Sequence, residues 1–252
     1  MRILKLDIEA APAKAYIWGL KTRYVPLSQV AEDGYILCFA YQWEGEDEVG
    51  FFSLWDHGYD TMVDAAWLLL DEADAVITYN GNGYDLPRLN SEFLAQRLGP
   101  PSPYYSIDLY ATVSKKFKVL SKSMKHMLDI LSLENKLEHK GMELWTNVMK
   151  GVKEDQAIME EYNIQDVIVM EDLYKELLPW IDNHPNRGLW MQQGEEPICP
   201  NCGSQHLKIK SYKRTRVLSY RQWLCLDCGF YPRERFAEET MKNKGRRFDI
   251  LT

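Results

Sequence analysis

The first ten residues place the strongest constraint on the fold, because an apolar run there carries two carboxylates, Asp7 and Glu9. The run over residues 2–8 is typical of a β-strand, in which residues i and i+2 project from the same face. Two like charges side by side destabilise such a strand unless a cation lies between them. The pair therefore predicts a metal site, provided that the rest of the chain supplies further ligands.

Length and composition allow one large domain, or a medium domain joined to a small one. The chain has 252 residues, of which 46% are hydrophobic, a share typical of globular proteins with a substantial core. No apolar run reaches the roughly 18 residues that a membrane span needs, and the chain begins with a strand pattern rather than a signal peptide. We therefore expect a soluble protein of the cytoplasm.

The formal net charge of −7 is unevenly distributed. Residues 197–252 carry 12 Lys/Arg and 5 Asp/Glu, whereas residues 1–196 carry 18 Lys/Arg and 32 Asp/Glu. This pattern indicates a basic attachment on an acidic body. An anionic partner is expected for the basic part, with nucleic acid first among the candidates.

Hydrophobic periodicity predicts an α/β fold with a mixed sheet. Strands are expected at residues 2–8, 15–20, 34–43, 49–55 and 75–79, and helices at 60–73, 86–98, 123–131 and 154–178. Pro179 ends the predicted helix 154–178, and a polar stretch rich in Asn, Gly and Gln follows it. We expect a catalytic domain over 1–180, a linker over 181–196 and a second domain over 197–252.

Two further carboxylates lie at the ends of predicted elements. Asp85 follows the strand 75–79 across a turn rich in Gly and Asn. Asp166 lies in the helix 154–178, four residues after Tyr162, so that both side chains share one helix face. Each acid alone is an ordinary surface feature. Together, four carboxylates suit two Mg²⁺ or Mn²⁺ ions, because these hard cations prefer oxygen ligands.

Three motifs resemble those of the DEDD 3′–5′ exonucleases, which have a ribonuclease H-like fold. They are Leu6–Glu9, Tyr79–Leu89 and Tyr162–Asp166, the last in the tyrosine variant of the family. The likeness covers about residues 1–180 and is best to the exonuclease domains of B-family polymerases and to phage-type stand-alone exonucleases. It implies a five-stranded mixed sheet flanked by helices.

The resemblance also implies roles for the motif residues. Asp7, Glu9, Asp85 and Asp166 would hold two Mg²⁺ or Mn²⁺ ions, and Tyr162 would orient the attacking water. The implied activity is metal-dependent 3′–5′ exonuclease cleavage of DNA, with single strands preferred. RNA stays open as a substrate. The resemblance also implies replication or recombination proteins as partners, in the cytoplasm of a bacterium or a phage-infected cell. Two alternatives stay open: an accessory nucleic-acid-binding protein with a vestigial site, and a structure-selective endonuclease.

Polar and aromatic residues near the motifs are candidate contacts to a nucleic-acid strand. Asn80 and Tyr84 are expected to contact substrate, while Tyr104, Tyr105 and Trp145 could stack on bases or simply pack in the core. The basic run 115–118 is read either as a phosphate contact or as a solvated helix face. For Asp108 we favour a structural role at a helix N-terminus.

Four cysteines form two Cys-x-x-Cys-Gly knuckles separated by 22 residues, Cys199/Cys202 and Cys225/Cys228. This pattern predicts one structural Zn²⁺ in a zinc ribbon, since Gly after the second Cys eases the turn. A disulfide pairing is disfavoured inside a cell, and nothing specific favours an iron–sulfur site. The fifth cysteine, Cys38, lies in an apolar run and is expected in the core.

The stretch between the knuckles alternates basic and aromatic residues, which suits contact with phosphates and bases. The candidate nucleic-acid contacts there are Lys210, Tyr212, Lys213, Arg214, Arg216, Tyr220, Arg221 and Trp223. The alternative is that these aromatic side chains only cover the zinc site of a small module. A basic tail, Lys242–Arg247, would add positive charge. The sequence does not predict an oligomeric state.

Overall fold

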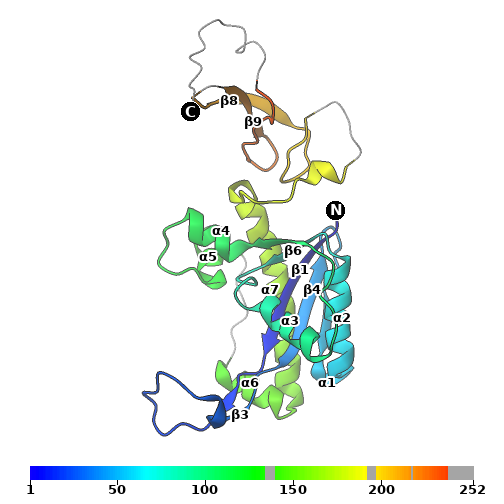
Figure 1. The fold of residues 1–252 in the computed structure, drawn as a ribbon, viewed down its shortest axis with the longest axis vertical. Coiled ribbons are helices and arrows are strands. Elements are labelled where there is room, and N and C mark those ends of the chain that lie inside the picture. The colour runs from blue at the N-terminus through cyan, green and yellow to red at the C-terminus, as the bar shows by residue number, and fades with distance from the viewer. Residues whose placement is uncertain (134–139, 192–196, 217, 238–252) are drawn as a thin grey trace, which may run out of the picture. The chain divides into compact units, whose positions relative to one another are not determined.

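The computed structural model describes residues 1–133, 140–191, 197–216 and 218–237 (Figure 1). The chain divides into two compact units, Met1–Tyr174 and Lys175–Thr252. Within the described ranges, no helix is long and apolar enough to cross a membrane. Residues 192–196 of the predicted linker and the predicted basic tail lie outside these ranges, and the predicted domain boundary at residue 180 stays a prediction.

The first unit is built on a five-stranded mixed sheet with the strand order β5-β4-β1-β6-β7. Its strands are β1 (Ile3–Ala10), β4 (Ile36–Trp43), β5 (Gly50–Ser53), β6 (Ala75–Thr78) and β7 (Tyr105–Asp108). Strand β1 pairs antiparallel with β4 and parallel with β6, and β7 continues the parallel half. The prediction of an α/β fold with a mixed five-stranded sheet flanked by helices is confirmed.

The helices of this unit follow the predicted segments closely, with three additions. They are α1 (Leu54–His57), α2 (Tyr59–Glu72), α3 (Asp85–Ala95), α4 (Leu109–Lys116), α5 (Met124–Leu131), α6 (Met142–Met149) and α7 (Lys153–Leu177). Side-chain caps fix two of their starts: Ser123 accepts a hydrogen bond from the His126 amide, and Asp108 accepts one from the Ala111 amide. The additions are α1, α4 and α6, which the sequence analysis did not delimit. Helix α1 takes up Leu54 and Trp55, the end of the predicted strand 49–55, so that strand is shorter than predicted.

The predicted strand at residues 15–20 is wrong for most of its length. Only Lys14–Ala15 form a strand, β2, which pairs with β3 (Val30–Glu32). Tyr16 and Trp18 were expected in a strand interior, yet they are 78% and 97% exposed. The aromatic pattern resembles a strand, but this stretch has no core to pack against, so pairing ends after Ala15.

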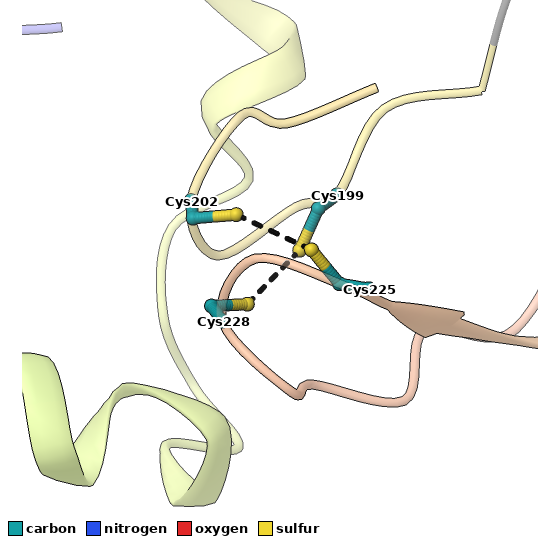
Figure 2. Close-up of side chains that lie close together, drawn as sticks. All are labelled: Cys199, Cys202, Cys225 and Cys228. Carbon is teal, nitrogen blue, oxygen red and sulfur yellow. Dashed lines mark hydrogen bonds between the residues drawn. The ribbon is translucent and has the colours of Figure 1, made fainter. Parts of the chain in front are cut away.

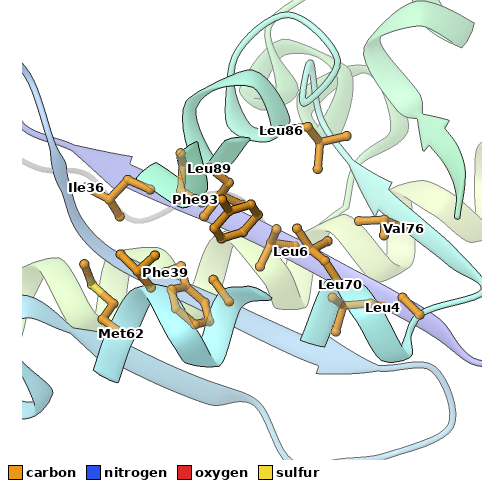
Figure 3. Close-up of a cluster of buried hydrophobic side chains, with 14 of the residues drawn as sticks. Leu4, Leu6, Ile36, Phe39, Met62, Leu70, Val76, Leu86, Leu89 and Phe93 are labelled. Carbon is orange, nitrogen blue, oxygen red and sulfur yellow. The ribbon is translucent and has the colours of Figure 1, made fainter. Parts of the chain in front are cut away.

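Alternate residues of β1 face two different layers. Leu4, Leu6 and Ile8 enter a hydrophobic cluster with residues of α2 and α3 such as Leu70 and Phe93 (Figure 3). Because side chains alternate along a strand, Lys5, Asp7 and Glu9 project from the opposite face. The first strand therefore stabilises the core with one set of residues and presents charged groups with the other.

Helix α7 lies against the charged face of β1. Lys5, whose side chain is 2% exposed, donates from Nζ to Glu171 Oε2 of α7 at 2.5 Å and to Gln42 Oε1 at 2.8 Å. A second hydrophobic cluster forms between β4 and α7, where Leu37 and Cys38 meet Met159. The predicted core position of Cys38 is confirmed, since this residue is fully buried.

The second unit contains η2 (Leu178–Trp180), η3 (Arg187–Leu189) and an antiparallel hairpin of β8 (Leu207–Arg214) and β9 (Ser219–Cys225). Buried Asn201 lies in the first cysteine knuckle and donates from Nδ2 to the carbonyls of Leu178 (2.9 Å) and Ile181 (3.2 Å). The knuckle is thereby anchored on the segment that directly follows α7.

Candidate active site and cysteine cluster

Three of the predicted metal-binding acids converge. Carboxylate oxygens of Asp7, Glu9 and Asp166 all lie within 4.8 Å of one another. Strand β1 supplies the first two from its charged face, and α7 supplies the third, which is 2% exposed. Three carboxylates in so small a space repel one another unless a cation offsets their charge. The all-oxygen donor set fits Mg²⁺ or Mn²⁺.

Asp85 lies beside this cluster rather than in it. It begins α3, is 5% exposed, and accepts a hydrogen bond at Oδ1 from the backbone amide of Ile8 at 3.2 Å. Ile8 stands between the two strand acids, so Asp85 is held next to both of them. Among the described residues, the acid cluster itself does not include the Asp85 carboxylate.

The turn before Asp85 is shaped by its Asn and Gly residues. Asn80 has a left-handed backbone with φ of 69°, and its carbonyl accepts from the Gly83 amide at 3.0 Å. A Cβ on Gly81 would come within 2.3 Å of Thr78 Oγ1, so only Gly fits there. Buried Asp108 fixes the turn by accepting from the amides of Asn80 (3.0 Å) and Asn82 (3.2 Å). The structural role predicted for Asp108 is confirmed.

Tyr162 is buried next to the acids. Burial raises the pKa of its hydroxyl well above the ordinary value, and the nearby charges of Asp166, Glu9 and Asp7 raise it further. The hydroxyl is therefore protonated throughout the physiological range. The Trp145 ring meets the Tyr162 ring edge-on, with centroids 6.3 Å apart, so Trp145 fixes the position of the tyrosine by packing.

Sequence reasoning missed Asn163. Its side chain is fully buried and donates from Nδ2 to Asp7 Oδ2 at 2.7 Å and to the Asp7 carbonyl at 3.2 Å. Asn163 thus joins α7 directly to a strand acid. The helical spacing could have indicated it, because Asn163 shares a helix face with Met159, Asp166 and Met170, which are all buried. A polar amide on a buried helix face needs a hydrogen-bond partner.

A pocket of about 400 Å³ adjoins Asp7. Its lining consists of Asp7, Tyr79, Asn80, Tyr110, Lys122, Ser123 and Met124. Tyr79 donates from its hydroxyl to the Lys122 carbonyl at 2.5 Å, which ties β6 to the segment before α5. The structure thus brings Asn80 and Asp7 to one pocket and adds Lys122 and Tyr110, which the sequence analysis gave no role.

The other aromatic candidates near the motifs differ in exposure. Tyr84 is 51% exposed, and its pKa is raised by partial burial and by the charges of Glu9 and Asp85, so its phenol lies near the acids. Tyr105 is 53% exposed at the start of β7. Tyr104 instead packs against the hydrophobic cluster beneath α2 and α3. Tyr84 is therefore the best placed of them to meet a ligand at the acids.

The four cysteines of the two knuckles converge in the second unit (Figure 2). The Cys199–Cys228 and Cys202–Cys225 Sγ–Sγ distances are both 3.6 Å. A disulfide would bring sulfurs to about 2.05 Å, whereas tetrahedral Zn²⁺ with Zn–S bonds of about 2.3 Å separates its sulfurs by roughly 3.8 Å. Gly203 and Gly229 follow the knuckles with φ of 80° and 78°, as the predicted turns require. The cluster fits a structural Zn²⁺.

The basic and aromatic residues of the hairpin are divided between solvent and packing. On β8 and just beyond it, Lys210, Tyr212, Lys213, Arg214 and Arg216 are exposed. On β9, Tyr220, Arg221 and Trp223 are half-buried: the Arg233 guanidinium lies 4.6 Å from the Tyr220 ring, and Trp223 donates from Nε1 to Glu234. The exposed β8 set remains available to a partner.

The sheet order, the flanking helices and the acid cluster on β1 and α7 define a ribonuclease H-like nuclease fold. A family model of the RNase H superfamily matches residues 28–178. The chain therefore belongs to the RNase H superfamily.

Solved structures add a similar fold within a larger enzyme. The family B DNA polymerase from the hyperthermophilic archaeon Pyrobaculum calidifontis matches with a TM-score of 0.54 and 18% sequence identity. The match covers 71% of this chain and 24% of the polymerase, so the chain spans about a quarter of that protein's length. Comparison with curated protein sequences gives no significant match.

Proposed function

We propose that the protein is a metal-dependent 3′–5′ exonuclease that shortens single-stranded DNA. The observation that carries this proposal is the convergence of the Asp7, Glu9 and Asp166 carboxylates within 4.8 Å, beside a pocket that Asp7 also lines. The resemblance of the three motifs to the DEDD exonucleases supplies the polarity of cleavage. The similar fold of a DNA polymerase favours DNA over RNA.

Asp7, Glu9 and Asp166 would hold Mg²⁺ or Mn²⁺, with Asp85 completing the donor set from the start of α3. When bound, two such ions supply an activated water and stabilise the departing oxygen of a phosphodiester. Asn163 keeps the Asp7 carboxylate oriented by donating to one of its oxygens at 2.7 Å. The Ile8 amide does the same for Asp85 at 3.2 Å.

Tyr162 would orient the attacking water as a neutral hydrogen-bonding group. A phenol is protonated at neutral pH, so the side chain positions a water rather than removing its proton. Burial against Trp145 limits the rotation of the ring. Orientation of this kind lowers the entropic part of the barrier.

The pocket beside Asp7 would receive the terminal nucleotide. Asn80 and Lys122 supply polar and cationic groups to its lining, and Tyr110 supplies an aromatic one. Tyr84 is half-exposed next to Glu9 and would contact the adjoining nucleotide. These groups offset the acidic balance of the first unit at the point where a phosphate must approach.

The second unit would hold one structural Zn²⁺ through Cys199, Cys202, Cys225 and Cys228 and contribute affinity for nucleic acid. The exposed Lys210, Lys213 and Arg214 of β8 carry the charge that phosphates require, and Tyr212 stands exposed among them. Such contacts would counteract repulsion between the acidic body and a polyanion.

The test is cleavage of single-stranded DNA labelled at its 5′ end, in Mg²⁺ or Mn²⁺, with RNA and circular single-stranded DNA in parallel. We expect stepwise shortening from the 3′ end, lost in Asp7→Asn and retained in Asp64→Asn, whose carboxylate is exposed on α2. Cleavage of the circle would instead indicate an endonuclease. Complete inactivity of the wild type with intact binding would indicate an accessory binding protein.

A further inference from the structure

A loop rich in exposed apolar side chains joins β2 to β3. Within residues 16–27, Tyr16 is 78% exposed, Trp18 97%, Leu20 97%, Tyr24 77% and Leu27 86%. Single exposed apolar residues are ordinary, but several large ones within one short loop indicate an interaction surface. We call residues 16–27 the aromatic loop.

The charge of the loop is opposite to that of its surroundings. Residues 10–31 contain Lys14, Lys21 and Arg23 and no Asp or Glu, although residues 1–196 hold 32 acidic residues. Lys14 is paired with Glu32, whereas Lys21 and Arg23 lie in the exposed loop itself. Cations interleaved with exposed aromatic rings suit a ligand that has both phosphates and flat bases.

The loop stands next to the acid cluster along the chain. Its base closes where the Ala11 amide donates to the Tyr35 carbonyl at 2.8 Å, two residues after Glu9. Lys14 pairs with Glu32, and the Tyr16 amide donates to Gln29 at 2.9 Å, so the base is a short hairpin. Figure 1 shows the loop in dark blue, projecting beyond the end of the sheet at which β1 ends.

We propose that the aromatic loop binds the single-stranded part of the nucleic acid whose 3′ end enters the acid cluster. Bases stack on Tyr16, Trp18 and Tyr24, and Lys21 and Arg23 contact the phosphates between them. The loop guides the strand toward Asp7 and Glu9 and gives this acidic unit its own affinity for a polyanion. The inference rests on the proposed function for the position of the 3′ end.

The first test measures strand binding in a protein that is expected not to cleave the strand. In the full chain carrying Asp7→Asn, fluorescence anisotropy of a labelled single-stranded oligonucleotide gives the dissociation constant. We expect Trp18→Ala to weaken binding about tenfold, in line with a lost stacking platform. The matched control Leu94→Ala, at a site 78% exposed on α3, leaves affinity unchanged. Equal affinity of the Trp18→Ala and parent proteins would overturn the proposal.

The salt dependence tests the phosphate contacts. Replacing Lys21 and Arg23 by Gln removes two cations, so the slope of log affinity against log salt should fall by about 1.4, since each single-strand phosphate contact contributes about 0.7. An unchanged slope would contradict the assignment of these two residues.

A one-nucleotide reporter separates this proposal from the proposed function. The p-nitrophenyl ester of thymidine 5′-monophosphate offers a phosphodiester to the acids but no strand to the loop. We expect wild type and Trp18→Ala to hydrolyse it equally, and Asp7→Asn not at all. If the wild type is inactive but strand binding still depends on Trp18, the proposed nuclease activity is refuted and the proposed binding by the aromatic loop is retained. If sedimentation shows that Trp18→Ala abolishes self-association and strand affinity is unaltered, the loop is a contact between copies and the proposal falls.

Discussion

At the scale of single residues, the acids are held in place by neighbours with no charge of their own. Asn163 reaches from α7 to the side chain and carbonyl of Asp7, and the Ile8 amide reaches Asp85. Groups that hold a metal ligand in this way affect ion affinity strongly, because they determine where its lone pairs point.

Asn163→Ala is therefore expected to raise the Mn²⁺ concentration needed for half-maximal activity about tenfold or more. Calorimetric titration with Mn²⁺ compares the metal affinity of Asn163→Ala and wild type directly, without substrate cleavage. Asn90→Ala, at an exposed site in α3, serves as the control and should leave both measurements unaltered. Equal Mn²⁺ affinity of Asn163→Ala and wild type would refute the positioning role.

The raised pKa of Tyr162 leads to a prediction about pH. An ordinary tyrosine ionises near pH 10, but burial and the surrounding acids keep this hydroxyl protonated above that pH. In the metal-free protein we therefore expect the tyrosinate absorbance that appears near pH 10 to be the same in wild type and in Tyr162→Phe. With metal bound, Tyr162→Phe should lower kcat about a hundredfold, as loss of a positioned catalytic group does. A tyrosinate signal near pH 10 that wild type shows and Tyr162→Phe lacks would contradict the raised pKa.

At the scale of elements, β1 and α7 together form the acid cluster, and a buried ion pair joins them. The Lys5 side chain is 2% exposed and its partner Glu171 25%. The two ends of this pair thus differ in their access to water. Removing the partner of a buried charge costs more than removing the buried charge itself.

Glu171→Leu should lower the free energy of unfolding by about 3 kcal/mol, because the Lys5 ammonium then keeps only the neutral Gln42 as a partner among those described. Lys5→Met should cost less, and the double variant should recover most of the loss. Urea unfolding measures all three. Glu32→Gln, which breaks the exposed pair with Lys14, is the control and should cost far less than Glu171→Leu, because water screens both partners. Equal losses from both single variants would contradict the asymmetry.

Much of this element structure could be predicted because periodicity reports burial. The apolar alternation of β1 and the helical spacing in α2 and α7 match the layers that these elements contact. The strand prediction for residues 15–20 was wrong because it rested on aromatic composition. Aromatic residues favour strands, but a strand forms only beside a neighbouring strand and against a core. Tyr16 and Trp18 have neither and face solvent instead.

The candidate site was predictable in part. The motifs identified Asp7, Glu9 and Asp166, and the structure brings their carboxylates together, although their roles stay predictions. Asn163 and Lys122 were not predicted, since their importance depends on which segments of the chain meet in the folded protein. That is a property of tertiary packing, which local patterns encode only indirectly.

At the scale of the whole molecule, the chain consists of two units with different sources of stability. In the described part of the first unit, two hydrophobic clusters form. In the described part of the second unit, β8 has no buried residue, and the cysteine cluster supplies two of the few buried side chains, Cys199 and Cys225. We therefore expect the second unit to depend on its metal, as small metal-binding modules generally do.

Chelation of Zn²⁺, or the substitution Cys199→Ser, should unfold the second unit and leave the first folded. Metal analysis should find one Zn²⁺ per chain in wild type and in the control Cys38→Ala, and none in Cys199→Ser. Hydrogen exchange measured by mass spectrometry assigns the loss of protection to each unit. Protection of β8 and β9 that survives zinc removal would contradict the prediction.

The alternation along β1 also sets the mutational tolerance of the chain. Leu4, Leu6 and Ile8 pack in the core, and the odd-numbered residues of the strand include both acids. Adding or deleting one residue between Ile3 and Leu6 would exchange the two faces, moving Asp7 and Glu9 into the hydrophobic layer and Ile8 toward α7. In a library of single-codon insertions, β1 should therefore be an intolerant window for expression and activity alike, whereas insertions in the aromatic loop at residues 16–27 should be tolerated for expression.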